Sequence, residues 1–283
     1  MQSVQVSTSI HIGGREEQQD AVGHWSNENS CLVVVADGVG GVQGGAEASS
    51  RVIASAELLW EKLNGNFPNP EKDLTHLAEA ANSSIHSLET NEKRSPASTL
   101  VALYISGSQA HWVHCGDSRL YMLRNGKPLK ITRDHSVVQM LLEQGKIEPH
   151  ELNTHPDKGR ILKSLGSSST FKGVDYASSE FQLGDSFLLC SDGYWESVDH
   201  GNPILPPKKP NHRMDRHLAQ LVNDAVQRNG EGSDNVTVAL VSTNRPQQPP
   251  STTPQTGGKS VLLVIFYTII ILDILLIIYF LVK

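Results

Sequence analysis

Three aspartates stand beside apolar, strand-like runs that lie far apart in the sequence. Asp37 follows the run CLVVVA, Asp192 follows FLLCS, and Asp234 lies at the entry of VTVALV. A carboxylate beside a buried strand is unfavourable unless a cation or hydrogen-bond donors compensate its charge. We therefore expect Asp37, Asp192 and Asp234 to converge on one shared cation site.

The residue types at this site favour hard divalent cations. Mg²⁺ and Mn²⁺ prefer oxygen ligands, and no His or Cys lies at ligand spacing beside the three acids, so Zn²⁺ is disfavoured. Two such ions close together acidify a water for in-line attack on phosphorus. Arg15, on a glycine-flanked loop, suits bidentate capture of phosphate oxygens. The pattern indicates metal-dependent phosphoester hydrolysis.

Periodicity and turn signals predict the elements that must position these groups. Besides the three runs above, we predict strands at Val4–Ile10, Val22–Trp25, Thr99–Ile105, Ala110–Cys115, Arg119–Arg124 and Pro128–Ile131. Helices are predicted at Glu47–Leu63, from Pro70 after an Asn69 cap, at Ser136–Gln144 and at His217–Arg228. Because hairpins and strand runs show no alternating strand–helix order, we expect an α+β domain with antiparallel sheets covered by helices.

Composition excludes some classes of protein. The formal net charge is −6 and no Lys/Arg stripe is present, so no nucleic-acid partner is expected. The three cysteines, each in an apolar run without CxxC spacing, indicate buried thiols in a reducing compartment.

The carboxyl-terminal segment differs sharply from the rest of the chain. Residues 261–282 are apolar apart from Thr268 and Asp273. As a helix this segment would be about 33 Å long, enough to cross a bilayer, and Asp273 would oppose insertion by only about 3 kcal/mol. We expect a globular domain at 1–243, a Pro/Gly-rich linker at 244–260 and a transmembrane helix at 261–282. The protein would then be a single-pass, C-terminally anchored protein of the inner or plasma membrane, with its domain in the cytoplasm.

A series of short motifs spans the soluble part in a fixed order. They are REEQQD (Arg15–Asp20), ADGVGG (Ala36–Gly41), GGAEAS (Gly44–Ser49), STLV (Ser98–Val101), CGDSRLY (Cys115–Tyr121), TRDHS (Thr132–Ser136), THP (Thr154–Pro156), LCSDGYWE (Leu189–Glu196) and SDNVT (Ser233–Thr237). In these motifs and their order, the chain resembles the bacterial-type PPM/PP2C metal-dependent serine/threonine protein phosphatases. The resemblance extends over roughly Ser7–Ser242. The resemblance implies a PP2C-like β-sandwich flanked by helices in four layers, αββα.

The resemblance also implies residue roles. Asp37 would bridge two Mn²⁺ or Mg²⁺ ions, the Gly38 carbonyl would bind the second, and Asp192 and Asp234 would complete the first. Asp20 would orient metal waters, and Arg15 would hold the substrate phosphate, which makes Arg15, Asp37, Asp192 and Asp234 the expected catalytic set. Asp117 and Glu196 would form a weaker third metal site, and Ile147–Gly173 would be the flap beside the active site.

The chain departs from the family pattern at three positions. Gln18 stands where the first motif usually has Asn, and Glu196 where Asp is common. Val39 occupies the position of a proton-donating His in many eukaryotic members, so the general acid is not identified. His114 and His155 are interpreted as structural or surface residues, and His135 as a brace for the flap.

The predicted function is hydrolysis of phosphoserine and phosphothreonine in proteins at the cytoplasmic face of a membrane. The expected partners are phosphorylated proteins, including a Ser/Thr kinase or its substrates. Two alternatives stay open at this stage. One is a phospho-binding scaffold of the same fold with little catalysis, and the other is a metal phosphohydrolase acting on nucleotides or lipid headgroups.

Overall fold

The computed structural model describes residues 3–39, 44–88, 95–198 and 214–244. The strands are β1 (Ser3–His11), β2 (Asp20–Ser26), β3 (Ser30–Val39), β4 (Ala97–Ser98), β5 (Leu100–Ser106), β6 (Gln109–Cys115), β7 (Arg119–Arg124), β8 (Lys127–Ile131), β9 (Asp175–Glu180), β10 (Ser186–Cys190) and β11 (Val236–Asn244). The α-helices are α1 (Gly44–Leu63), α2 (Pro70–His86), α3 (Val137–Glu143), α4 (Asp192–Trp195) and α5 (Met214–Asn229), and short 3₁₀ turns cover Pro149–Glu151 and Gly230–Gly232.

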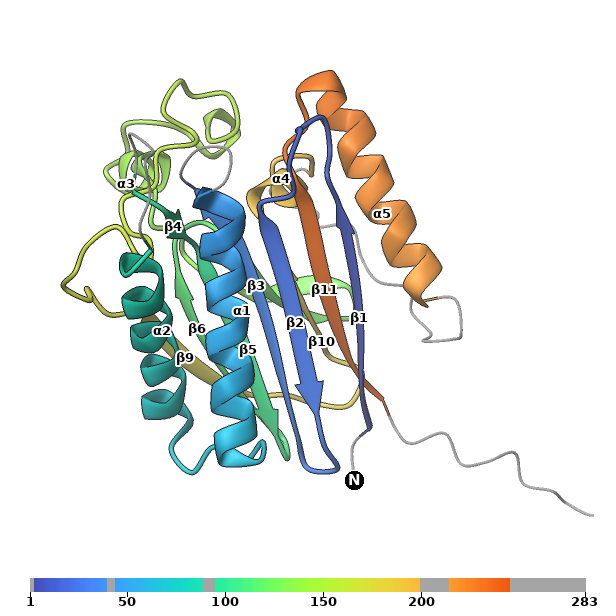
Figure 1. Ribbon diagram of the computed structural model, residues 1–283. Coiled ribbons are helices and arrows are strands. Elements are labelled where there is room, and N and C mark those ends of the chain that lie inside the picture. Colours follow the sequence, from blue (N-terminus) through green and yellow to red (C-terminus); the bar gives the residue numbers. More distant parts are fainter. Residues whose placement is uncertain (1–2, 40–43, 89–94, 199–213, 245–283) are drawn as a thin grey trace, which may run out of the picture. The chain divides into compact units, whose positions relative to one another are not determined.

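Two antiparallel sheets form the centre of the domain. Sheet A has the order β1-β11-β10-β7-β8, and sheet B has the order β2-β3-β5-β6-β9, with β4 paired to β3. Helices α1 and α2 cover the outer face of sheet B, while α5 lies along sheet A on the opposite side of the sandwich (Figure 1). The expected α+β fold with two antiparallel sheets flanked by helices is therefore confirmed.

Strand β3 is buried on both faces, as its continuous apolar sequence predicts. Leu32 and Val34 pack toward α1 and α2, and Val33 and Val35 pack against sheet A. The strand is longer than expected, because Asp37 and its neighbour Gly38 still belong to the ladder rather than following it.

Local signals predicted most element boundaries. The Asn69 side chain accepts a hydrogen bond from the Lys72 backbone N–H at 3.2 Å and caps α2. Asn125 and Gly126 adopt φ of +49° and +78° in the turn between β7 and β8, the backbone that favours Asn-Gly in hairpins. Helix α1 begins three residues before the predicted Glu47, at Gly44.

Several short elements were missed, including the two-residue strand β4, the 3₁₀ turns, strand β9 and helix α4. Strand β9, with the sequence DYASSE, lacks the alternation of a half-buried strand, and pairs with β6 at the edge of sheet B. The four-residue helix α4 is too short to show a helical period.

Some expectations fall on residues that the structure does not describe. Residues 245–260 of the expected linker and the apolar segment 261–282 lie outside the described residues. None of the helices in the described part of the chain is long and apolar enough to span a bilayer.

Candidate active site

Aspartates from both sheets lie at one end of the sandwich. Asp20 and Asp37 stand opposite each other in the β2–β3 pair of sheet B. Asp192 begins α4 directly after β10, and Asp234 lies two residues before β11, so both come from sheet A. Asp117 lies in the connection from β6 of sheet B to β7 of sheet A. Helix α3 and part of the flap lie at this same end (Figure 1).

The aspartates lie close enough to alter one another's protonation. Burial, followed by repulsion from Asp192 and Asp20, raises the pKa of Asp37 well above its usual range. Burial, followed by repulsion from Asp117 and Asp234, does the same for the pKa of Asp192. Burial also raises the pKa of Asp20 to about 6 and the pKa of Asp117 to about 7. The structure thus brings Asp37, Asp192 and Asp234 together with two further acids.

Two carboxylate oxygens of this cluster have no hydrogen-bond partner among the described residues. They are Oδ1 of Asp117 and Oδ1 of Asp192, both buried. A buried, unpaired carboxylate oxygen is unfavourable, whereas an oxygen-binding cation would satisfy it. The donor set therefore fits hard divalent ions.

Asp20 is fixed from two sides. Its Oδ2 accepts a hydrogen bond of 2.7 Å from the Ser191 hydroxyl, which itself accepts from the Thr237 backbone N–H at 3.0 Å. Its own N–H donates to Oε1 of Gln18 at 3.0 Å. The longer amide of Gln18 thus still closes a local turn in front of Asp20.

Close backbone packing surrounds Asp37 and Gly38. The Asp37 N–H donates to the Thr99 hydroxyl at 2.9 Å, and the Thr99 N–H donates to the Asp37 carbonyl at 2.8 Å. A Cβ on Gly38 would lie 2.0 Å from the Gly45 carbonyl oxygen, so only glycine fits at this position.

Asn235 holds the loop that carries Arg15. Its side-chain amide donates to the carbonyls of Ile12 and Glu17 at 2.7 and 3.1 Å, and its Oδ1 accepts from the Gln19 N–H at 2.7 Å. The Arg15 guanidinium lies 2.6 Å from Oδ2 of Asp234. Arg15 therefore pairs with a predicted metal ligand, rather than with the neighbouring glutamates that a surface role would favour.

A buried network positions Asp117. The Trp195 indole N–H donates to the Asp117 carbonyl at 2.9 Å, and the Arg119 guanidinium lies 3.7 Å from the centre of the Trp195 ring. Arg119 also forms a bidentate ion pair with Asp134, at 2.9 and 2.7 Å. Three of the sequence motifs thus meet in one arrangement that fixes the loop of Asp117.

Glu196 lies at the end of α4 and faces the flap. Its Oε2 is 2.7 Å from the Lys158 ammonium, and its carbonyl accepts a hydrogen bond of 3.2 Å from the Asn153 side chain. Glu196 is also near Asp117 and Asp192, because its charge contributes to raising the pKa of both. The expected third-site residue thus has a cationic partner within the protein.

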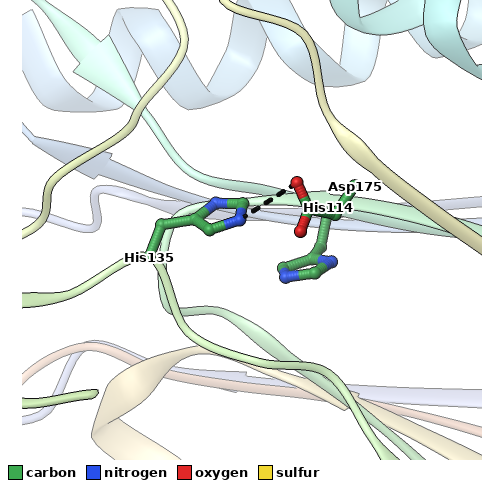
Figure 2. A group of neighbouring side chains, drawn as sticks. All are labelled: His114, His135 and Asp175. Atoms are coloured by element: carbon green, nitrogen blue, oxygen red, sulfur yellow. Dashed lines mark ion pairs between the residues drawn. The ribbon is translucent and has the colours of Figure 1, made fainter. Parts of the chain in front are cut away.

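A second group of potential ligands lies at the other end of the flap. Ligand atoms of His114, His135 and Asp175 all lie within 4.8 Å of one another, which makes them a candidate metal site (Figure 2). The His114 Nε2 lies 2.7 Å from the Arg133 carbonyl oxygen, so this nitrogen carries a proton and donates it.

The hydrogen bonds of His135 favour a brace over a metal ligand. Its Nδ1 accepts from the Gly116 N–H at 3.1 Å, which leaves the proton on Nε2, facing Asp175 at 3.3 Å (Figure 2). Burial, with the neighbouring His114 and Lys163, lowers the pKa of His135, so the ring is neutral at pH 7. The His135 carbonyl also accepts from the Leu162 N–H at 2.7 Å, as expected for a residue that holds the flap.

Sequence reasoning missed the residues that support the site. Lys158 is part of an irregular segment with no period to indicate which side chains face inward. Asn235 and Trp195 lie inside the motifs named above. Asn235 directly follows Asp234 and Trp195 lies shortly after Asp192, and these positions could have identified them. Asp175 belongs to the unpredicted strand β9.

Comparisons with known proteins agree with this geometry. The protein phosphatase 2C family matches residues 9–223. The chain is 32% identical to protein phosphatase PhpP of Streptococcus pneumoniae over 247 residues, which cover 85% of this chain and 98% of PhpP.

Two solved structures share the fold. The S. agalactiae serine/threonine phosphatase superposes with a TM-score of 0.74 at 26% identity, covering 85% of this chain and 99% of that one. The catalytic domain of the serine/threonine phosphatase PstP, solved in complex with two manganese ions, gives a TM-score of 0.71 at 26% identity, covering 87% of this chain and 100% of that one.

The family match covers most of the chain. It includes Asp20, Asp37, Asp117 and Asp192, and ends before Asp234. The chain belongs to the bacterial protein phosphatase 2C family and is a metal-dependent serine/threonine protein phosphatase.

Proposed function

We propose that Asp37, Asp192 and Asp234 hold a pair of Mn²⁺ or Mg²⁺ ions, with Asp37 between them. The Gly38 carbonyl would bind the second ion, and Asp192 and Asp234 would complete the first. The observation that carries this proposal is the cluster itself, in which five neighbouring carboxyl groups include two buried oxygens without a hydrogen-bond partner among the described residues. An all-oxygen donor set suits these hard ions. The PstP structure with two manganese ions supports the same number here.

The roles of the protein's own residues follow from their positions. When bound, the two cations supply an acidified water as nucleophile and neutralise negative charge on the phosphoryl group. Asp20, held by Ser191 and Gln18, is placed to accept hydrogen bonds and to orient water at the site. The Arg15 side chain is 56% exposed, so its guanidinium can bind both Asp234 and an incoming phosphate.

The proposed substrates are proteins phosphorylated on serine or threonine at the cytoplasmic face of a membrane. The names of the relatives support the phosphoprotein class, and the apolar segment 261–282 supports the location. A membrane-bound Ser/Thr kinase or its targets would then be the partners that share this surface.

The function can be tested with the Asp192→Asn variant. We expect Mn²⁺-dependent hydrolysis of a phosphothreonine peptide by the wild-type protein, and a loss of at least ~100-fold in the variant, because a charged ligand is removed. Asp215→Asn, an exposed acid in α5, is the matched control and should retain full activity. Full wild-type activity in excess chelator would contradict the proposal.

The substrate class is tested by comparison within one assay. Phosphoprotein, nucleotide and lipid-headgroup phosphoesters are offered to the wild-type protein at equal concentration. A kcat/KM highest for the phosphoprotein supports the proposal, and a preference for a nucleotide or a headgroup would replace it with the alternative phosphohydrolase.

The membrane anchor is tested by fractionation of the full chain. The protein should remain in the membrane pellet after alkaline carbonate extraction. A variant with Ile271→Arg and Leu275→Arg should shift to the supernatant, since each arginine opposes insertion by about 3 kcal/mol. Recovery of the unaltered chain wholly in the supernatant would refute the anchor.

A further inference from the structure

The flap carries a positive charge to the edge of the aspartate cluster. The Lys158 ammonium lies 2.7 Å from Oε2 of Glu196, whose side chain is only 19% exposed. The Asn153 side chain, also from the flap, donates to the Glu196 carbonyl at 3.2 Å. The flap is therefore attached to the end of α4 at two points, four residues from Asp192.

The acids near Glu196 attract cations. Asp117 and Asp192 each keep a buried Oδ1 without a hydrogen-bond partner among the described residues, and Asp117 is 2% exposed. Glu196 acts electrostatically on both of these groups. Glu196 is therefore an electrostatic neighbour of both aspartates, and Lys158 is the cation that the chain itself brings to Glu196.

The charges of the site balance when Lys158 is included. Two divalent cations and the Arg15 guanidinium together compensate the five clustered aspartates. Glu196 is the acid that remains, and the Lys158 ammonium compensates it through a direct contact. With Lys158 in place, Glu196 needs no further metal ion.

We propose that Lys158 is a built-in counter-ion of Glu196 that takes the place of a third divalent cation at the edge of the aspartate cluster. The contact of the flap with the end of α4 then also places the counter-ion beside Glu196. The inference rests on the proposed binuclear centre and adds to it a reason why this chain would bind two metal ions rather than three.

Other flap lysines show what is specific to Lys158. Lys163 pairs with Asp175, whose side chain is 55% exposed, at 3.3 Å. Lys172 is an exposed lysine of the same segment. Lys172 is therefore suited to a control substitution with the same change of charge.

The test is the number of Mn²⁺ ions bound by the full chain in detergent, measured from the electron paramagnetic resonance signal of free Mn²⁺ during titration. We expect two ions per chain for the wild-type protein and for Lys172→Gln. Lys158→Gln should bind three, because Glu196 loses its partner and becomes free to bind metal. Two ions in Lys158→Gln, or three in the wild type, would overturn the inference.

A double variant tests whether Glu196 binds the additional ion. Lys158→Gln combined with Glu196→Gln should return to two ions per chain, since the proposed position loses an acid. Three ions in the double variant would show that Glu196 does not take part, and would contradict the inference. Fewer than two ions in the wild type would instead contradict the binuclear centre, so the two failures can be distinguished.

Discussion

At the residue scale, the site depends on acids that are unfavourable without a cation. Burial and mutual repulsion raise the pKa of Asp37 and Asp192, and neither group has an arginine or lysine as a direct ion-pair partner among the described residues. Asp234 differs, since it pairs with Arg15. Cation binding should therefore depend strongly on the residues that hold the acids in place.

Asp20→Asn should weaken Mn²⁺ binding without removing a proposed ligand. The amide keeps the shape, and its one oxygen can still accept from the Ser191 hydroxyl, but it loses the negative charge and the second acceptor oxygen. We expect a rise of about 10- to 100-fold in the Kd for Mn²⁺, the usual effect of losing a residue that supports metal ligands. The measurement is a Mn²⁺ titration, and an unchanged Kd would show that Asp20 does not support the site.

Arg15→Lys should act on substrate binding. A lysine keeps the charge but loses the planar pair of donors that matches a phosphate. We expect KM for a phosphothreonine peptide to rise about 10-fold, corresponding to one charge-assisted hydrogen bond, with little change in kcat. Steady-state kinetics separate the two constants, and a fall in kcat at constant KM would indicate a different role.

The sequence predicts the acids better than their surroundings. Asp37, Asp192 and Asp234 were found because each adjoins an apolar run. This pattern can be recognised without knowing the order of the strands in the sheets. The Lys158–Glu196 contact and the His114–His135–Asp175 group were not found. The first joins residues whose proximity depends on how the irregular flap folds back on the domain. The second depends on the pairing of β6 with the unpredicted strand β9, which places Asp175 opposite His114.

At the element scale, α4 is held in place by a buried ion pair. Arg119 of β7 lies against Trp195 of α4 and pairs with Asp134, and both charged side chains are less than 10% exposed. Because these contacts also fix the Asp117 carbonyl, they connect the stability of the domain to the geometry of the site.

Asp134→Asn should destabilise the fold by about 3 kcal/mol, because it leaves the Arg119 charge buried without a full counter-charge. Asp157→Asn is the matched control, since Asp157 pairs with Arg160 on the surface. That exposed pair should contribute at most about 1 kcal/mol. Urea unfolding measures both, and equal effects of the two substitutions would contradict this account.

Secondary structure was predictable where local chemistry determines it. Asn69 before Pro70, and Asn125 before Gly126, mark a helix start and a hairpin through their own backbone preferences. Strand β9 has no such signal, because it is an edge strand whose pairing with β6 supplies the structure that its sequence does not indicate.

At the scale of the whole molecule, the stability of the domain should depend on metal and pH together. The pKa of Asp20 is raised to about 6 and that of Asp117 to about 7, above their ordinary value of 3.8. The folded, metal-free protein therefore binds more protons than the unfolded chain over this interval. Its free energy of unfolding must fall as the pH rises through it.

In chelator, we expect Tm to decrease between about pH 4 and pH 7, relative to the protein saturated with Mn²⁺. The increase in Tm on adding Mn²⁺ should accordingly grow with pH, since cations bind the ionised carboxylates. Differential scanning calorimetry at several pH values measures this increase. An increase that is independent of pH would contradict the proposed coupling between the acids.

The central claim is that Asp37, Asp192 and Asp234 hold a pair of divalent cations. Anomalous diffraction at the manganese edge, from crystals grown with Mn²⁺, tests it most directly. The account predicts two peaks between these carboxylates, near the Gly38 carbonyl. The absence of peaks there, or manganese bound only at His114, His135 and Asp175, would contradict it.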